Sequence, residues 1–248
     1  FYTLYDFASR IGGDRANVIN LVPAGVEPHD WSPKSRDLIA MGKAQLFVYN
    51  GAGFEGWVHD FLEGLKPGSG PAVIEASSGI ELLHGEHREG EDDHGHEHGE
   101  GASDVDPHVW VSPKSAIRIV ENIKNGFVQA DPANQSYYEE TYDKLRTELA
   151  ELDAKFERMI AAAPRKEIVV SHQAFGYLCR DYGLTQMAIM GLSPDAEPTA
   201  QELKAILDFV KEHNVRYIFF EELVSDKLAR TLAADARIET LVLNPLEG

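Results

Sequence analysis

Short runs of apolar and β-branched residues recur along the chain, separated by polar stretches that have helical spacing. Near-continuous apolar runs of this length are typical of strands buried on both faces of a parallel sheet. The predicted strands cover residues 18–24, 45–51 and 72–78 in the first half, and 167–172, 186–192, 217–222 and 240–246 in the second. Strands that alternate with helices predict an α/β fold, and the two groups predict two βαβ-type lobes with parallel sheets.

The polar stretches between these runs carry helix-start signals. Ser32 and Pro33 match an N-cap residue followed by a proline at the first helical position. Thr199 and Glu202 have the spacing of a capping box. Helices are therefore predicted over residues 32–43, 198–213 and 225–236.

A longer helix is predicted between the two groups of strands. Its apolar positions follow each other at intervals of 4, 3, 4, 3, 4 and 3, at Tyr138, Tyr142, Leu145, Leu149, Leu152, Phe156 and Met159. This one-sided stripe continues over about six turns. A coiled coil with a partner is the alternative, but we expect one stiff helix that lies along both lobes. The predicted organisation is an N-terminal lobe over 1–130, a connecting helix over 131–163 and a C-terminal lobe over 164–248.

The segment from about residue 84 to 104 interrupts this pattern, because it is rich in Gly, His and acidic residues and has almost no apolar ones. It cannot contribute to a core, so a mobile surface loop is expected. Its five histidines are His84, His87, His94, His96 and His98. Tracts of this composition have metal affinity without a fixed coordination geometry. We expect weak, auxiliary zinc binding here.

Composition narrows the class of protein. The chain has 248 residues, 43% of them hydrophobic, and a formal net charge of −18. This acidity argues against binding to nucleic acid or to anionic membranes, both of which attract basic surfaces. No apolar run reaches the ~18 residues of a membrane span. The sequence begins at Phe1 within a stretch that has the pattern of a folded element, which favours a mature or trimmed chain. The lack of a signal peptide is therefore uninformative.

The cysteine content excludes two kinds of site. Cys179 is the only cysteine, so neither an intrachain disulfide nor a cysteine-based zinc site can form. Its neighbours indicate a helix that packs inward, and we expect a small buried apolar side chain rather than a reactive thiol.

Three histidines outside the acidic segment have settings suited to metal binding. His29 and His108 occur in near-repeats, EPHDW and DPHVW, in which proline restricts the backbone just before the histidine. His172 follows a predicted strand, where α/β sheets usually bind their ligands. Imidazole nitrogen is a common Zn²⁺ ligand, and three such ligands plus a carboxylate or water complete a tetrahedral site.

Several carboxylates could supply the fourth ligand, and their spacing does not choose among them. The candidates are Glu27, Asp30, Glu221, Glu222 and Glu247. A zinc hydrolase or lyase is an alternative, because three histidines and a water also form a catalytic arrangement. Against it, the chain has no HExxH motif and no evident nucleophile elbow, and Ser171 points away from its strand neighbour His172.

Seven stretches in this order resemble the zinc-specific solute-binding proteins of bacterial ABC transporters: LVPAGVEPHDWSP, YNGAGFEGWV, DPHVWVSP, SHQAFGYL, GLSPDAEPTAQEL, YIFFEELVS and LNPLEG. The resemblance covers nearly the whole chain. It implies two α/β lobes joined by one rigid helix, with the metal site in the cleft between them.

The resemblance also implies roles for particular residues. The histidines of EPH, DPH and SH bind the metal in this family, which corresponds to His29, His108 and His172. The glutamate of NPLE, here Glu247, is the fourth ligand in Gram-positive-like members, whereas water takes its place in others. Manganese carriers replace the SH histidine with a carboxylate, so His172 favours zinc.

The function implied by the resemblance is transport rather than catalysis. Such a protein captures Zn²⁺ outside the cytoplasm, in a periplasm or as an anchored lipoprotein on the cell surface, and delivers it to a membrane permease. We expect a monomer that does not bind nucleic acid. The alternative within the family is a manganese or iron carrier.

Overall fold

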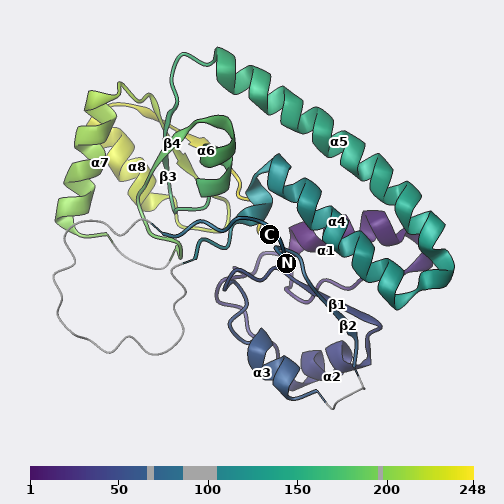
Figure 1. The fold of residues 1–248 in the computed structure, drawn as a ribbon. Helices are drawn as coiled ribbons and strands as arrows, with labels where there is room; N and C mark the ends of the chain where they lie inside the picture. The colour runs from purple at the N-terminus through teal and green to yellow at the C-terminus, as the bar shows by residue number, and fades with distance from the viewer. Residues whose placement is uncertain (66–69, 86–104, 195–197) are drawn as a thin grey trace.

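The computed structural model describes residues 1–65, 70–85, 105–194 and 198–248. It has two α/β lobes with a long helix beside them (Figure 1), as predicted. The exact lobe limits at residues 130 and 164 stay a prediction. None of the helices formed by the described residues has both the length and the apolar character needed to cross a bilayer.

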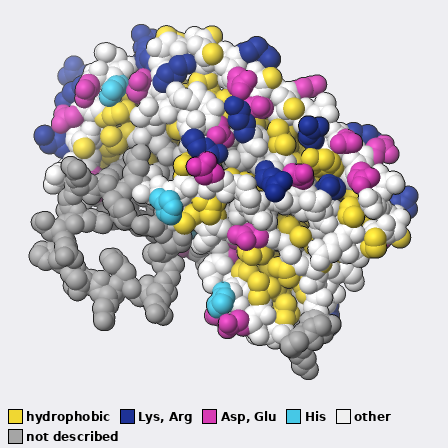
Figure 2. All heavy atoms as spheres, viewed as in Figure 1, with side chains coloured by type: hydrophobic (Ala, Val, Ile, Leu, Met, Phe, Trp, Pro, Cys, Tyr) yellow, Lys and Arg dark blue, Asp and Glu magenta, His cyan; other side chains and the backbone are white. Residues whose placement is uncertain are grey.

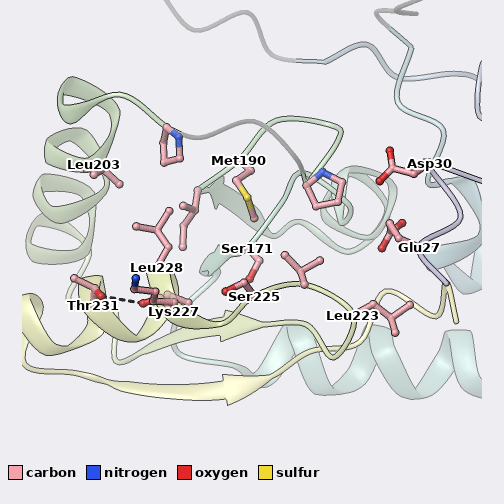
Figure 3. Close-up of a pocket in the computed structure, with 15 residues that line it drawn as sticks. Glu27, Asp30, Ser171, Met190, Leu203, Leu223, Ser225, Lys227, Leu228 and Thr231 are labelled. Carbon is pink, nitrogen blue, oxygen red and sulfur yellow. Dashed lines mark hydrogen bonds between the residues drawn. The ribbon is translucent and has the colours of Figure 1, made fainter. Parts of the chain in front are cut away.

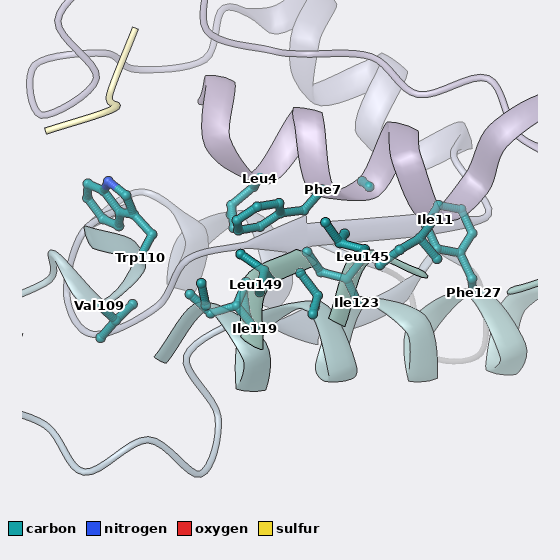
Figure 4. Packing of buried hydrophobic residues seen from close by; sticks show 14 of the residues in the cluster. Leu4, Phe7, Ile11, Val109, Trp110, Ile119, Ile123, Phe127, Leu145 and Leu149 are labelled. Atoms are coloured by element: carbon teal, nitrogen blue, oxygen red, sulfur yellow. The ribbon is translucent and has the colours of Figure 1, made fainter. Parts of the chain in front are cut away.

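The first lobe has a parallel pair of strands, β1 (Leu46–Tyr49) and β2 (Ala72–Glu75). Its helices are α1 (Tyr2–Gly12), α2 (Ser35–Lys43), α3 (Val58–Glu63) and α4 (Pro113–Ala130), with short 3₁₀ turns at Gly13–Arg15 and Val109–Val111. Leu4 and Phe7 of α1 pack onto Ile119 and Ile123 of α4 in the core of this lobe (Figure 4).

The second lobe has a four-stranded parallel sheet in the order β4-β3-β5-β6. Its strands are β3 (Glu167–Val170), β4 (Thr185–Ala188), β5 (Tyr217–Phe220) and β6 (Glu239–Val242). Its helices are α6 (Gly176–Tyr182), α7 (Ala200–Glu212) and α8 (Lys227–Ala236). The predicted capping box of α7 is present, since the Glu202 amide donates to Thr199 and the Thr199 amide donates to Glu202.

Two details of the predicted elements are wrong. Residues 18–24 form no strand, because they pair with neither strand of the first-lobe sheet; residues 18–21 instead line a cavity of about 670 Å³ together with β1. Helix α2 begins at Ser35 rather than at Pro33, because the carboxylate of Asp37 accepts a hydrogen bond from the Lys34 amide and so fixes a later start.

The long helix α5 (Gln135–Ala162) follows a 3₁₀ turn at Pro132–Asn134 and contacts α1 and α4 of the first lobe and α6 of the second. Its 28 residues span roughly 42 Å at 1.5 Å per residue. The stripe holds from the start of the helix to its middle, where Tyr138, Leu145 and Leu149 are buried. It is wrong at Leu152 and Met159, which are 39% and 61% exposed, although Phe156 between them packs against the second-lobe cluster that includes Phe175 and Leu178.

The remaining sequence predictions have different outcomes. Cys179 is buried in α6, as expected. The predicted auxiliary histidines His87, His94, His96 and His98 lie outside the described residues, and His84 forms an isolated antiparallel bridge with Val105. On the face shown in Figure 2, the described Lys and Arg side chains are interspersed with Asp and Glu, unlike the basic surface of a nucleic-acid-binding protein.

Candidate metal centre

Four of the predicted residues meet between the lobes. His29 lies in the irregular stretch before α2, and His108 lies directly before the 3₁₀ turn at Val109–Val111. His172 follows β3 by two residues, and Glu247 lies beyond β6, near the chain end seen at the middle of Figure 1. One ligand atom from each of these residues lies within 4.8 Å of the other three.

The distances within this group are short and similar. The Nε2 atom of His108 lies 3.1 Å from Nε2 of His29 and 3.2 Å from Nε2 of His172. The Oε1 atom of Glu247 lies 3.4, 3.6 and 3.7 Å from Nε2 of His108, His172 and His29. In a tetrahedral zinc site with bonds of about 2.0–2.1 Å, neighbouring ligand atoms lie roughly 3.3 Å apart. The spacing therefore fits four bonds to one small cation.

The group is closed to solvent except at one histidine. His108 and His172 are fully buried, and Glu247 is 3% exposed. The side chain of His29 is 11% exposed. The Glu247 Oε1 atom is buried and, among the residues that the structure describes, has no hydrogen-bond partner. An oxygen in this position is costly unless a cation or a donor satisfies it.

Two of the histidines are oriented by carboxylates behind them. The Nδ1–H of His108 donates to Asp106 Oδ1 at 2.7 Å, and the same oxygen accepts the His108 amide at 2.9 Å. His172 repeats this arrangement with Glu221, at 2.8 Å from Nδ1 and 3.2 Å from the amide. In the neutral imidazoles these bonds keep the proton on Nδ1, so that the Nε2 lone pairs point at the centre once the Nε2 protons are lost.

The structure also corrects the set of carboxylate candidates. Glu221 is not in the cluster of four, because its carboxylate supports His172 from behind. Glu222 is exposed and accepts a hydrogen bond from Asn244. Glu27 accepts the His29 amide at 3.3 Å, and Asp30 is exposed, so neither joins the cluster.

Sequence reasoning missed the supporting role of Asp106. The available signal was the acidic residue two positions before each proline-fixed histidine, which occurs in both EPH and DPH. In both motifs the carboxylate accepts the amide of the histidine, although only in DPH does it also reach the imidazole Nδ1.

The charges in the centre depend strongly on each other. Burial alone lowers the pKa of His172, but the carboxylates of Glu221 and Glu247 outweigh it and raise this pKa to about 10. The pKa of His108 is also raised, by Asp106 and Glu247 against burial. Burial lowers the pKa of His29. Burial alone raises the pKa of Glu247, but the three histidines hold it well below its usual value.

A cavity of about 720 Å³ lies next to the centre (Figure 3). Glu27 and Asp30 stand at one end of it, and Leu203 and Thr231 at the other. Burial and the nearby Glu247 raise the pKa of Glu27 to about 7. Ser171 lines the cavity and donates to the Phe219 carbonyl at 3.3 Å, so it is not part of the four-residue group.

Comparison with known proteins identifies the family. All 248 residues match the family model described as "Zinc-uptake complex component A periplasmic". The chain belongs to this family. Membership makes it the binding component of a zinc-uptake system rather than an enzyme, which sets aside the hydrolase alternative. It also places the protein outside the cytoplasm.

Curated relatives agree with this family. The high-affinity zinc uptake system protein ZnuA of Bacillus subtilis (strain 168) is 44% identical over 249 residues, which cover 100% of this chain and 77% of the relative. The zinc-binding lipoprotein AdcA of Streptococcus pneumoniae (strain ATCC BAA-255 / R6) is 39% identical over 251 residues. That match covers 100% of this chain but 49% of AdcA, so the chain spans about half of this longer relative.

A solved structure shares the fold of the family. The Zn(II)-bound ZnuA-like domain of Streptococcus pneumoniae AdcA is similar with a TM-score of 0.81 and 38% sequence identity. The match covers 100% of this chain and 86% of that domain. Two lobes beside a long helix are thus a property that this chain shares with the family.

Proposed function

We propose that the protein binds one Zn²⁺ through His29, His108, His172 and Glu247, and delivers it to the membrane permease of an ABC transporter. The observation that carries this proposal is the convergence of three Nε2 atoms and one carboxylate oxygen, all within 4.8 Å of one another in a buried site. Nitrogen and oxygen ligands in this number are those that zinc accepts in tetrahedral geometry.

The ligand set favours zinc over the manganese or iron alternative. Harder cations such as Mn²⁺ select carboxylate, carbonyl and water oxygens, whereas imidazole suits zinc. Three of the four proposed ligands are imidazoles. The carboxylates of Asp106 and Glu221 are placed behind imidazoles rather than at the metal, so they raise ligand basicity without adding oxygen ligands.

Each lobe contributes two of the proposed ligands, and this suggests how the ion is held. His29 and His108 come from the first lobe, and His172 and Glu247 from the second. A bound cation joins the two lobes, so release requires either movement between lobes or the withdrawal of one ligand. His29 is the ligand nearest to solvent, since its side chain is 11% exposed and the other three are almost fully buried.

We further infer that the protein works as a monomer, because one chain supplies all four proposed ligands. The proposed location is a periplasm or, with a lipid anchor, the outer surface of the cell membrane. Light scattering of the zinc-loaded protein should give the mass of one chain, and a dimer mass would contradict the first point. Fractionation of cells that express the natural protein distinguishes the two locations.

Calorimetric titration of the metal-stripped protein tests the proposed site. One tight zinc event is expected, with much weaker binding of Mn²⁺. His172→Ala should weaken zinc binding roughly 100-fold or more, because it removes a ligand and leaves Glu221 without its partner. His213→Ala is the matched control, since His213 lies in the same lobe with its Nδ1 4.0 Å from Glu167. Unchanged affinity in His172→Ala would contradict the site.

Delivery needs a separate test. In cells that depend on this protein for growth at low zinc, the wild-type chain should restore growth and His172→Ala should not, with both present at equal levels. Full growth with the variant would contradict the proposed link between this site and uptake.

A further inference from the structure

Tyr177 belongs to a helix of the second lobe but is buried in the core of the first. It lies in the first turn of α6 and is fully buried in the hydrophobic cluster that includes Val109 and Trp110. Leu83, from the segment after β2, packs against the same cluster. The ring of Tyr177 therefore extends from the second lobe into the core of the first, next to the residues that follow His108.

The hydroxyl of Tyr177 joins two segments of the first lobe. It accepts a hydrogen bond from the Leu83 amide at 3.0 Å and donates one to the Asp106 carbonyl at 2.7 Å. Leu83 and Asp106 are also bonded directly, from the Asp106 amide to the Leu83 carbonyl at 2.8 Å. Burial raises the pKa of Tyr177 to about 12, so the hydroxyl stays protonated and remains a donor.

Asp106 links this hydroxyl to a proposed ligand. Its main chain is held by Tyr177, and its carboxylate holds both the amide and the Nδ1 of His108. Gly176, the residue before Tyr177, allows α6 to approach Asp106 closely, because a Cβ added at this position would lie 2.5 Å from Asp106 Oδ2. The start of α6 thus rests directly on the group that orients His108.

A neighbouring residue of α6 reinforces the contact. The guanidinium of Arg180 lies 5.0 Å from the centre of the Tyr177 ring and donates to the Glu81 carbonyl at 2.9 Å. His172, another proposed ligand, precedes this helix by only a few residues. One short stretch of the second lobe therefore carries the proposed ligand His172 and also contacts Asp106, which orients the proposed ligand His108 of the first lobe.

We propose that Tyr177 is a positioning residue for zinc binding. It sets the orientation of His108 through Asp106 and holds the ligands of the first lobe at a fixed position relative to those of the second. This inference rests on the proposed zinc site. Loss of the hydroxyl leaves the Leu83 amide and the Asp106 carbonyl without this partner. Asp106 can then shift, and a displaced partner of a ligating histidine typically lowers metal affinity 10–100-fold.

The test compares two tyrosines of α6 that each lose one hydroxyl. Tyr177→Phe removes the bonds to Leu83 and Asp106, whereas the control Tyr182→Phe removes a 2.8 Å bond to Asp153. Zinc affinity and the zinc dissociation rate are measured for both variants, with thermal unfolding of the metal-free proteins. We expect Tyr177→Phe to weaken zinc binding about tenfold and to speed dissociation, with less than a twofold effect in Tyr182→Phe.

A double-mutant cycle tests the route through Asp106. Asp106→Asn and Tyr177→Phe should be strongly non-additive in zinc affinity, because both act on the same imidazole. The visible spectrum of the Co²⁺-loaded protein should change in Tyr177→Phe and not in Tyr182→Phe, since it reports the geometry of the ligands. A purely structural residue would lower the unfolding temperature and leave this spectrum unchanged.

The outcomes separate this inference from the proposed function. If the wild-type chain does not bind zinc, the proposed function fails. If the wild type binds zinc, the inference is overturned by unchanged affinity and dissociation in Tyr177→Phe, by an equal effect in Tyr182→Phe, or by full additivity with Asp106→Asn.

Discussion

The indole Nε1–H of Trp110 donates a buried hydrogen bond of 2.7 Å to the carbonyl of Pro245. Trp110 lies two residues after His108, and Pro245 lies two residues before Glu247. The Thr3 hydroxyl donates to the carbonyl of Leu246, which is the next residue. The first lobe therefore holds the segment of the second lobe that presents Glu247.

Trp110→Phe should weaken zinc binding about fivefold, the typical effect of one lost buried hydrogen bond, because Glu247 is no longer held in place. Titration of the purified variant with zinc measures this effect. Trp57→Phe is the control, because this partly buried tryptophan packs in the separate cluster around Phe47. Equal zinc affinity in the two variants would show that the indole does not position Glu247.

Glu221→Gln should lower zinc affinity 10–100-fold, because the neutral amide polarises His172 less than the carboxylate does. Glu222→Gln makes the same chemical change at the next residue, which is exposed and bonded to Asn244, and should change affinity less than twofold. Competition with a chelator of known affinity provides the measurement. Similar affinities for both variants would remove Glu221 from the site.

Zinc binding should release protons at neutral pH. The pKa of His172 is raised to about 10 in the metal-free protein and that of His108 is also raised, so His172 is protonated at pH 7.5. Zinc must displace this proton. Affinity should therefore rise with pH from below 7 towards about 10, and the binding enthalpy at pH 7.5 should depend on the ionisation enthalpy of the buffer. Affinity that is flat between pH 7 and 10 would contradict the raised pKa of His172, and affinity that is flat below pH 7 as well would contradict histidine ligation.

The raised pKa of His172 has the opposite effect on the stability of the metal-free protein, which should fall as pH rises. A histidine whose folded pKa exceeds its unfolded value of about 6.5 stabilises the protein below pH 6.5. This contribution is lost as pH rises through about 10. The metal-free protein should thus unfold more readily at pH 9 than at pH 7, by a margin that His172→Gln reduces. Metal-free unfolding in urea at both pH values measures the margin.

Replacing residues 85–104 with Asn-Gly should leave one tight zinc site. His84 and Val105 already form an antiparallel bridge, and the Asp106 amide donates to the Leu83 carbonyl, so a two-residue hairpin turn can join them. If the deleted histidines bind additional zinc weakly, only the later part of the titration curve disappears. Loss of the tight event would mean that the deleted segment supplies a ligand.

The sequence predicted the second lobe well because its signals are local. Each of its four apolar runs formed a strand, although the strands end two to four residues before the predicted runs do. The ladders stop where the chain turns towards the metal centre, as at His172. The run at 18–24 failed because strand formation needs a backbone partner, and a partner is not visible in the run itself.

The three histidines among the proposed ligands were also predictable from local signals, whereas Glu247 was implied only by the family resemblance and most of the supporting residues were not predicted. His29, His108 and His172 are marked by a preceding proline or by a strand end, which a single sequence reveals. The DPH motif carried a local signal for Asp106, which contacts His108 two residues away. The contacts of Trp110 and Tyr177, by contrast, depend on how the lobes face each other, since each reaches a residue distant in sequence. No local pattern specifies these contacts.

The short path from His172 to Tyr177 limits how this protein can vary in length. Both residues are anchored, one at the metal centre and the other between Leu83 and Asp106, so an insertion between them would force one anchor out of place. The chain between Leu83 and Asp106 is tied together at its two ends and can gain or lose residues without moving His108. Among natural variants, we expect length differences to accumulate in the second stretch and to be absent from the first.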